Sequence, residues 1–310
     1  MNFLLIIGGL ILLVLGGNWL LKSAVALSLK LNISKVVIGM TVVSFATSAP
    51  ELIVSINAAL NGSPDLALGN VIGSNIANLG LVLGITLFFG RMKVEKNFYK
   101  TDWPVMMIAS ALLFLFLAND NVILQYEGVL LFSFLVIFLI YLLRSQKNID
   151  VDELEEGDIP VRGFKIFIFL LLGGLGLWGG SELLIKGATS LATEFGVTER
   201  VIGVTIVSLG TSIPELAASL IAVIKKEKAI SLGNLIGSNI FNILAVIGVT
   251  SIITPISLSD ERLLTSDIYW MLGISFIILP MVFLPKKYRL SWRSGIVLLI
   301  GYCVFIYITL

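Results

Sequence analysis

Two stretches of the chain repeat each other and decide its fold: residues 39–58 read GMTVVSFATSAPELIVSINA, and residues 203–222 read GVTIVSLGTSIPELAASLIA. A second matching pair follows, LGNVIGSNIANL at 68–79 and LGNLIGSNIFNI at 232–243. The same offset of 164 residues separates the members of both pairs, and the repeat runs without a gap from about residue 16 to 84. The sequence therefore predicts two copies of one structural unit.

The composition places these copies in a membrane. Of the 310 residues, 57% are hydrophobic and only 13% are charged, whereas a soluble domain carries about 25% charged residues. So few charges cannot cover a soluble surface of this size, which argues against a cytosolic enzyme. A helix needs about 20 apolar residues to cross a bilayer. We predict an all-α polytopic membrane protein with ten transmembrane helices, near residues 3–29, 36–60, 66–90, 103–118, 126–143, 163–192, 200–224, 229–254, 266–284 and 292–309.

Five predicted helices fall in each half of the chain, residues 1–143 and 163–310, on either side of an acidic linker at 144–162. Because five is an odd number, the second half must enter the membrane from the opposite side. The repeats at about 39–84 and 203–248 are then inverted copies, which is typical of secondary transporters with a binding site near the midplane. A channel would instead favour a symmetric ring of several subunits.

The Lys and Arg residues predict how the chain is oriented. With the N-terminus outside, 17 of the 21 Lys and Arg residues fall in inner loops, and only Arg200 and Arg262 fall in outer loops. Basic residues mark cytoplasmic loops, so we expect both termini outside and the linker in the cytoplasm. Its acidic run at 150–158 lacks the spacing of an EF-hand loop. The first segment lacks the basic start of a signal peptide, and we expect it to remain as a helix of an integral inner (plasma) membrane protein.

The residue types that are missing exclude several functions. The chain has no His and one Cys, Cys303, so a thiolate cluster, a disulfide framework and imidazole chemistry are excluded. A net charge of +1 offers no basic surface for nucleic acid. With no His and no deep Asp, an intramembrane protease has no catalytic pair. We expect no enzyme activity, no cofactor and no obligate protein partner; the remaining polar groups are hard oxygen ligands.

Each copy carries polar residues on one face of an apolar helix. In the first copy the spacing i, i+4, i+7, i+11 places four of them on one face: Ser44, Ser48, Glu51 and Ser55. The equivalents in the second copy are Ser208, Ser212, Glu215 and Ser219. In the next helix of each copy a Ser and an Asn four residues apart share a face, Ser74 with Asn78 and Ser238 with Asn242. Four polar faces in apolar helices predict one shared polar cavity.

Pro50 and Pro214 stand directly before the two glutamates. A proline inside a helix leaves a carbonyl about four residues earlier without its hydrogen bond, which a membrane tolerates only where that carbonyl lines a cavity or binds a ligand. Small residues let membrane helices approach closely. We expect close approaches or bends at the glycines of the third and eighth helices, at positions 69, 73, 233 and 237.

Glu51 and Glu215 are the only carboxylates that the sequence places deep in apolar segments. A charge at the centre of a bilayer costs at least about 3 kcal/mol, so these two predict a function rather than a packing role. No Lys or Arg in the cavity can neutralise them, and carboxylate, carbonyl and amide oxygens are what Ca²⁺ takes as its six to eight ligands. Ser55 and Ser219 fit helix packing as well as ion binding. Helix capping and ion binding are both open for Asn70, Asn75, Asn234 and Asn239.

The motifs around these residues resemble the α-repeats of the calcium/cation antiporter superfamily, in its sodium/calcium exchanger branch. In the first copy they are Ala46-Thr47-Ser48-Ala49-Pro50-Glu51 and Gly73-Ser74-Asn75-Ile76-Ala77-Asn78. In the second copy they are Gly210-Thr211-Ser212-Ile213-Pro214-Glu215 and Gly237-Ser238-Asn239-Ile240-Phe241-Asn242. The resemblance covers nearly the whole chain. It implies ten helices and four clustered ion sites, one for Ca²⁺ and the others for Na⁺, which are exchanged by alternating access.

The resemblance also implies a role for each site residue. Glu51 and Glu215 would be the central ligands, with backbone oxygens from Thr47 and Thr211. The flanking Na⁺ sites would be completed by Ser48, Ser74, Ser212 and Ser238 and by the carbonyls of Ser44 and Ser208. Asn78 and Asn242 would line the centre.

Asn242 departs from the pattern of many prokaryotic and potassium-dependent relatives, which carry Asp at this position. The site loses one carboxylate, which argues against K⁺ dependence. The chain also lacks the Gly-Asn-Ala-x-Glu type of motif of the proton-coupled branch. Exchange of Ca²⁺ for Na⁺ is therefore the predicted function. Exchange of Ca²⁺ for H⁺ is the alternative, because two membrane glutamates could still titrate.

Overall fold

The structure, a computed structural model, describes residues 2–145, 163–196, 210–284 and 287–309. Nine helices within these residues are long and apolar enough to cross a membrane. They are Asn2–Leu31, Lys35–Leu60, Pro64–Phe89, Phe98–Asp120, Gln125–Ser145, Gly163–Glu194, Lys228–Ile253, Leu263–Phe283 and Trp292–Thr309. The predicted all-α membrane fold is confirmed, and nine predicted spans lie where their apolar runs placed them.

The remaining predicted span, 200–224, is described only from residue 210 onward, where a shorter apolar helix, Ile213–Ile224, forms. The acidic run at 150–158 lies outside the described residues.

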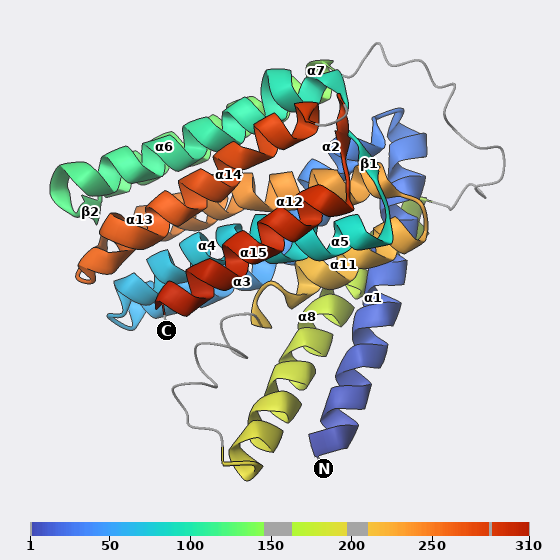
Figure 1. The fold of residues 1–310 in the computed structure, drawn as a ribbon, viewed down its shortest axis with the longest axis horizontal. Coiled ribbons are helices and arrows are strands. Elements are labelled where there is room, and N and C mark those ends of the chain that lie inside the picture. Colours follow the sequence, from blue (N-terminus) through green and yellow to red (C-terminus); the bar gives the residue numbers. More distant parts are fainter. Residues whose placement is uncertain (1, 146–162, 197–209, 285–286, 310) are drawn as a thin grey trace. The chain divides into compact units, whose positions relative to one another are not determined.

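Several spans are composites of α-helix and π-helical segments, the latter labelled η (Figure 1). The first half contains α1 (Asn2–Leu31), α2 (Lys35–Ile38), η1 (Gly39–Val43), α3 (Ser44–Leu60), α4 (Pro64–Ala77), η2 (Asn78–Leu83), α5 (Gly84–Phe89), β1 (Met92–Lys93), η3 (Phe98–Asp102), α6 (Trp103–Asp120), β2 (Val122–Ile123) and α7 (Gln125–Ser145). The second half contains α8 (Gly163–Glu194), α11 (Ile213–Ile224), α12 (Lys228–Phe241), η6 (Asn242–Ile247), α13 (Gly248–Ile253), β3 (Ile256–Ser257), η7 (Leu263–Asp267), α14 (Ile268–Phe283), β4 (Arg289–Leu290) and α15 (Trp292–Thr309).

The secondary structure of the two copies repeats as their sequence does. The elements α4, η2, α5 and β1 recur as α12, η6, α13 and β3, each shifted by the same 164 residues. The π-helical segments η2 and η6 begin at Asn78 and Asn242, two of the predicted site residues. Short π-helical turns inside α-helices are frequent at functional sites. The local backbone therefore singles out the same positions as the polar pattern.

By packing, the chain divides into two compact units, which are described one at a time below. Unit 1 comprises residues 1–47 and 140–234, and unit 2 comprises residues 48–139 and 235–310. Each unit contains segments of both sequence halves, so the predicted halves describe the repeat rather than the packing. The three boundaries fall inside α3 after Thr47, inside α7 after Leu139, and inside α12 after Asn234.

In unit 1 the helices α1 and α8 lie side by side and run in opposite directions (Figure 1). A Cβ atom on Gly9 would lie 2.7 Å from the carbonyl oxygen of Gly180, and one on Gly16 would lie 2.9 Å from that of Gly173. The two backbones approach this closely because these positions carry no side chain. Gly9 and Gly173 are repeat equivalents, as are Gly16 and Gly180. The pair Gly9–Gly180 is therefore equivalent to the pair Gly173–Gly16, with the two helices exchanged. An inverted repeat produces this symmetry.

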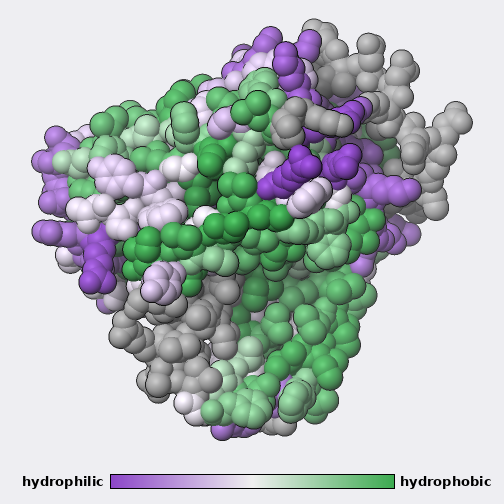
Figure 2. Space-filling model, viewed as in Figure 1, coloured by the Kyte–Doolittle hydropathy of each residue, from purple (hydrophilic) through white to green (hydrophobic). Residues whose placement is uncertain are grey.

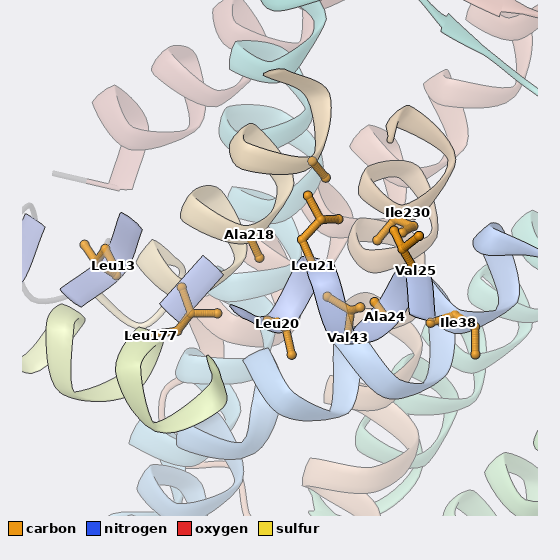
Figure 3. Close-up of a cluster of buried hydrophobic side chains, with 11 residues drawn as sticks. Leu13, Leu20, Leu21, Ala24, Val25, Ile38, Val43, Leu177, Ala218 and Ile230 are labelled. Carbon is orange, nitrogen blue, oxygen red and sulfur yellow. The ribbon is translucent and has the colours of Figure 1, made fainter. Parts of the chain in front are cut away.

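A hydrophobic cluster forms the core of unit 1 (Figure 3). Its buried members are Leu13, Leu20, Leu21, Ala24, Val25, Ile38, Val43, Leu177, Ala218, Ala222 and Ile230. The last of them lies on the first turn of α12, whose backbone also packs closely against α2 and η1. A Cβ atom on Gly39 would lie 2.5 Å from the carbonyl oxygen of Ile230, and Gly233 faces the carbonyl of Val36. This packing fixes the part of α12 that leads into the candidate site.

For the glycines of the third and eighth helices, the expected close approach occurs at Gly233 and is absent at Gly69 and Gly73. A Cβ atom on Gly73 would meet no heavy atom within 4 Å, and one on Gly69 would meet only the Leu263 side chain, at 3.8 Å. These two glycines are therefore not sites of close backbone approach. Sequence alone does not show which face of a helix meets another backbone.

Two short strand pairs in unit 2 show the inversion directly. Strand β1 pairs with β4 and strand β2 pairs with β3, both antiparallel. The helix α6 leads from β1 to β2, whereas its equivalent α14 leads from β3 to β4. The helices α6 and α14 pack against each other and connect the same two strand pairs in opposite directions (Figure 1). Equivalent helices of the two copies therefore run antiparallel in this unit, as the odd number of spans predicted.

Candidate ion-binding site

The predicted site residues that the structure describes are buried. Ten of them are no more than 3% exposed: Ser44, Thr47, Ser48, Glu51, Ser74, Asn78, Ser212, Glu215, Ser238 and Asn242. Thr211 is half-buried, and Ser208 lies outside the described residues. In the described part of the chain no Lys or Arg is buried. The two glutamates are therefore buried without a buried basic side chain to offset their charge.

Two further carboxylates among the described residues are buried by packing. Asp102 and Glu127 are each only 4% exposed. Asp102 directly precedes α6, and Glu127 lies in the first turn of α7, where its Oε2 accepts a hydrogen bond from the Leu124 N–H at 2.8 Å. Both lie where an apolar run begins rather than in the middle of one, and they are buried by packing.

In unit 2, Glu51 is held in a turn of α3 that bonds to α4. The Asn70 side chain donates from Nδ2 to the Ser55 hydroxyl at 3.0 Å, and the same nitrogen lies 3.4 Å from the backbone oxygen of Glu51. The Ser74 hydroxyl donates to the Asn70 carbonyl at 2.6 Å. The sequence left Ser55 open between packing and ion binding, and Asn70 open between helix capping and ion binding; the two side chains form a bond between helices. They position the turn that carries the carboxylate.

Four asparagines from the two copies form a symmetric network in unit 2. Asn78 Nδ2 donates to Asn239 Oδ1 at 3.2 Å, and Asn242 Nδ2 donates to Asn75 Oδ1 at 3.1 Å. Asn75 Nδ2 donates in turn to the backbone oxygen of Asn239 at 3.2 Å, and Asn239 Nδ2 donates to that of Asn75 at 3.3 Å. Every bond is matched by its repeat equivalent. Asn75 and Asn239 are therefore not helix caps; they orient the side chains of Asn78 and Asn242.

The network leaves two amide oxygens available. Oδ1 of Asn78 and Oδ1 of Asn242 are buried and accept no hydrogen bond from the described residues. A buried oxygen without a partner is costly, and nearly all such atoms in proteins find one. The two amides behind them are also contacted by sulfur: Asn75 Nδ2 lies 3.8 Å from Met271 Sδ, and Asn239 Nδ2 lies 3.9 Å from Met106 Sδ. The oxygens Oδ1 of Asn78 and Oδ1 of Asn242 are therefore available to bind a cation.

In unit 1, Ser44 and Thr47 are tied to the first part of α12. The Ser44 hydroxyl lies 2.9 Å from the carbonyl oxygens of both Gly39 and Asn234. The Thr47 hydroxyl lies 3.3 Å from the Ser44 carbonyl oxygen and 3.2 Å from Asn234 Oδ1. Asn234 Nδ2 donates to the Ser219 hydroxyl at 3.0 Å, which is the equivalent of the bond between Asn70 and Ser55. The hydroxyl hydrogens are thus used within the protein, and the oxygens keep lone pairs.

The second copy of the glutamate motif opens α11 in unit 1. Ser212 precedes the helix, Pro214 lies in its first turn, and Glu215 follows, fully buried. Proline has no N–H to donate to the carbonyl four residues earlier, which is that of Gly210. This oxygen accepts instead from the Ser181 hydroxyl of α8 at 2.8 Å. The Ser212 hydroxyl is buried and forms no hydrogen bond with the described residues. Its oxygen, three residues before Glu215, is therefore available to bind a cation.

Each unit therefore presents oxygen donors around its own carboxylate, Glu215 in unit 1 and Glu51 in unit 2. Carboxylate, amide, hydroxyl and carbonyl oxygens are the ligands of hard cations, whereas softer metals favour thiolate and imidazole. Within the described residues no cluster of three or more His, Cys, Asp or Glu side chains occurs, so a transition-metal centre has no ligand set there. The chemistry available is the binding and release of alkali and alkaline-earth ions.

Comparison with known proteins agrees with this chemistry. The sequence profile described as sodium/calcium exchanger protein matches residues 1–144 and 165–310. The chain belongs to the sodium/calcium exchanger family. The protein CaxA of Alkalimonas amylolytica is 37% identical to this family member over 307 residues, covering 97% of this chain and 96% of CaxA. The sodium/calcium exchanger MaX1 of Methanosarcina acetivorans is 31% identical over 349 residues, covering 98% and 97% of the two chains.

The fold of this family member is also similar to a solved structure of the sodium-calcium exchanger NCX_Mj. The two chains superpose with a TM-score of 0.84 at 27% identity, covering 100% of this chain and 99% of the other. The family that the glutamate and asparagine motifs suggested is therefore confirmed. The exchanger family consists of transporters rather than enzymes.

The interpretation of the sequence missed the roles of Asn75 and Asn239. A signal was present: both stand three residues before a predicted site asparagine, and both recur at the 164-residue offset. Their hydrogen bonds run between copies, however, and periodicity within one helix does not reveal a partner on another. The role of Ser181 had no signal of this kind, because its repeat equivalent is Gly17.

Proposed function

We propose that this chain is a secondary active antiporter that exchanges Ca²⁺ for Na⁺ by alternating access. Glu51 and Glu215 are the acidic ligands, and Thr47 and Thr211 contribute backbone oxygens. The flanking Na⁺ sites take oxygens from Ser44, Ser48, Ser74, Ser208, Ser212 and Ser238, and Asn78 and Asn242 line the centre. The termini face outward and the linker faces the cytoplasm.

The observation that carries the proposal is the complete burial of two equivalent carboxylates in a part of the chain without a buried Lys or Arg. An uncompensated charge in an apolar interior is strongly unfavourable. A divalent cation balances two carboxylates, and the unpartnered oxygens of Asn78 and Asn242 are ligands that such an ion prefers. Either one Ca²⁺ or several Na⁺ can therefore supply the missing charge.

The relatives support the same ions. MaX1 is named a sodium/calcium exchanger, and one NCX_Mj structure was obtained after soaking with Na⁺ and Ca²⁺. Asn242 is neutral, so this site carries two carboxylates and no third one to recruit K⁺. Exchange that does not depend on K⁺ is part of the proposal.

Ion flux from proteoliposomes tests the proposal. The full chain is reconstituted with Na⁺ inside, and Ca²⁺ uptake is measured with a Na⁺ gradient at equal pH. A parallel sample has a pH gradient with choline in place of Na⁺. We expect uptake in the first case only, and no dependence on added K⁺.

Each contrary outcome identifies a different mechanism. Uptake that follows the pH gradient without Na⁺ would replace Na⁺ by H⁺ as the coupling ion. Uptake with neither gradient would indicate a channel. Empty liposomes give the leak that is subtracted from both samples.

A further inference from the structure

The strand pair β1–β4 carries an unusual concentration of positive charge. Lys93 of β1 stands directly opposite Arg289 of β4 in the antiparallel ladder. The described segments on either side add further exposed basic residues, which gives the set Arg91, Lys93, Lys96, Lys100, Lys287, Arg289 and Arg293, with one exposed carboxylate, Glu95, among them. Figure 2 shows hydrophilic residues gathered over these two strands. We call these seven residues the basic strand surface.

The direct pairing of Lys93 with Arg289 is unfavourable in isolation. The Cβ atoms of directly opposite residues in an antiparallel pair lie about 5 Å apart, and like charges at such positions are destabilising. Within the described residues the only salt bridge joins Lys35 to Glu227, so it involves neither Lys93 nor Arg289. The ladder is short, with one further backbone bond from Val94 N to Tyr288 O at 3.0 Å. A ligand with negative charge between Lys93 and Arg289 would remove the repulsion.

Aromatic residues lie beside the basic strand surface. The rings of Tyr99, Phe283 and Tyr288 contact one another with centroids 5.5 to 5.8 Å apart. Trp292 begins α15, is 45% exposed, and has the Arg293 guanidinium 5.6 Å from its ring centroid. Trp and Tyr are enriched at the level of the lipid headgroups. Aromatic residues beside the basic strand surface are thus typical of a surface at the height of the lipid phosphates.

The opposite strand pair shows that the fold does not require this charge. In β2–β3, Val122 stands opposite Ser257 and Ile123 opposite Ile256, so no charged residue lies in the ladder. The flanking segments contribute acidic residues instead: Asp65, Asp120, Asp260 and Glu261. The positive-inside rule accounts for the sign of the charge at each end. It does not account for two basic side chains placed opposite each other in one ladder.

We propose that the basic strand surface binds the phosphodiester headgroup of an anionic phospholipid, with Lys93 and Arg289 on either side of the phosphate. The repulsion between Lys93 and Arg289 favours binding of the lipid, because its phosphate compensates both positive charges. A phosphate anion carried by a lipid fits a surface flanked by these aromatic residues and reaches its site by diffusion in the leaflet. The binding is independent of the ions that the chain transports.

Lipid-dependent stability tests the proposal on the complete protein. The thermal midpoint is measured in neutral detergent during titration with phosphatidylglycerol, phosphatidylcholine or soluble glycerol phosphate. We expect phosphatidylglycerol to raise the midpoint at a concentration about tenfold or more below that of phosphatidylcholine, from the attraction of two juxtamembrane cations. Glycerol phosphate at equal phosphate concentration is expected to have no effect. An equal response to it would replace the lipid by free phosphate as the ligand.

Two variants locate the effect. Lys93→Glu places opposite charges in the ladder, so it is expected to raise the midpoint without lipid and to abolish the preference for phosphatidylglycerol. The control Arg144→Gln/Lys165→Gln lowers the charge by two at exposed basic residues elsewhere on the predicted inner face and is expected to keep the preference. Equal loss in both variants would mean diffuse surface charge without a site. Unchanged preference in Lys93→Glu, or no preference in the unaltered protein, would overturn the proposal.

Discussion

Glu51 and Glu215 are 0% exposed in helices that are otherwise apolar. At each position a neutral glutamine of the same size would remove the need for a compensating ion. Because a buried charge is expensive even when it is paired, the change should not weaken folding. At these two positions a carboxylate favours ion binding, whereas a neutral side chain favours folding stability.

We predict that Glu51→Gln and Glu215→Gln each reduce Ca²⁺ exchange to the level of empty liposomes while the protein purifies and unfolds as the unaltered chain does. One carboxylate cannot balance a divalent ion. The measurement is Ca²⁺ uptake under a Na⁺ gradient, together with the thermal midpoint of each variant. Exchange at the unaltered rate in either variant would show that the carboxylate is not a ligand.

Asn75 and Asn239 act through the side chains that they orient. We predict that Asn75→Ala and Asn239→Ala weaken the apparent Ca²⁺ affinity by about 10- to 100-fold, as is usual for partners that orient a metal ligand. The measurement is the Ca²⁺ concentration at half-maximal exchange. Thr250→Val is the control, because Thr250 is buried in the same unit and its hydroxyl has no partner among the described residues. An equal effect of the control would reduce the network to general packing.

The sequence predicted the polar faces of single helices because the spacing of Ser44, Ser48 and Glu51 depends only on helix geometry. It could not show that Asn75 bonds to Asn239, because that bond depends on which faces of two distant segments meet. It also gave no sign that Asp102 is buried, since hydropathy depends on the neighbours in sequence and not on the neighbours in space.

At the scale of elements, the pairing of α1 with α8 depends on positions without side chains. Helix α8 offers adjacent glycines in different surroundings. A Cβ atom on Gly180 would lie 2.8 Å from the backbone nitrogen of Leu13, whereas one on Gly179 would meet no heavy atom within 4 Å. The apolar runs predicted the lengths of these helices well. The two-residue strands were not predicted, because each finds its partner far away in sequence.

We predict that Gly180→Ala lowers the thermal midpoint of the purified protein and Gly179→Ala leaves it unchanged or raises it slightly. Both changes gain about 0.5–1 kcal/mol of helix propensity. Only the first forces two backbones apart, at about 1–3 kcal/mol. The comparison is made by thermal unfolding in one detergent. Equal midpoints would mean that the crossing is loosely packed.

At the scale of the whole molecule, the orientation follows from the distribution of Lys and Arg. We predict that a cysteine introduced at 150–158 reacts with a membrane-impermeant maleimide only from the cytoplasmic side, and one at 257–264 only from outside. The native Cys303 is exposed, so Cys303→Ser is the background for both variants. Labelling from the reversed sides would contradict an outward N-terminus.

The net charge of the site predicts the response to voltage. Two carboxylates loaded with one Ca²⁺ are neutral, and loaded with three Na⁺, the number that the family resemblance implies, they carry one positive charge. Moving that charge is worth about 2.3 kcal/mol per 100 mV. With the potential of Na⁺-loaded proteoliposomes clamped by valinomycin, Ca²⁺ uptake should accelerate when the compartment receiving Na⁺ is negative. Uptake that is indifferent to voltage would mean two Na⁺ per Ca²⁺, or a protonated glutamate.

The exchange of partners between the strand pairs bears on the ancestry of the chain. Every strand in β1–β4 and β2–β3 pairs with a strand of the other sequence half. One half alone would therefore leave its two strands unpaired. A second molecule inserted upside down would complete them, and the present chain has the architecture of such a dimer after gene duplication and fusion. In a fused chain the two copies can carry different residues at equivalent positions. A homodimer would carry identical charges at its two ends, whereas here one ladder holds Lys93 and Arg289 and the other is uncharged.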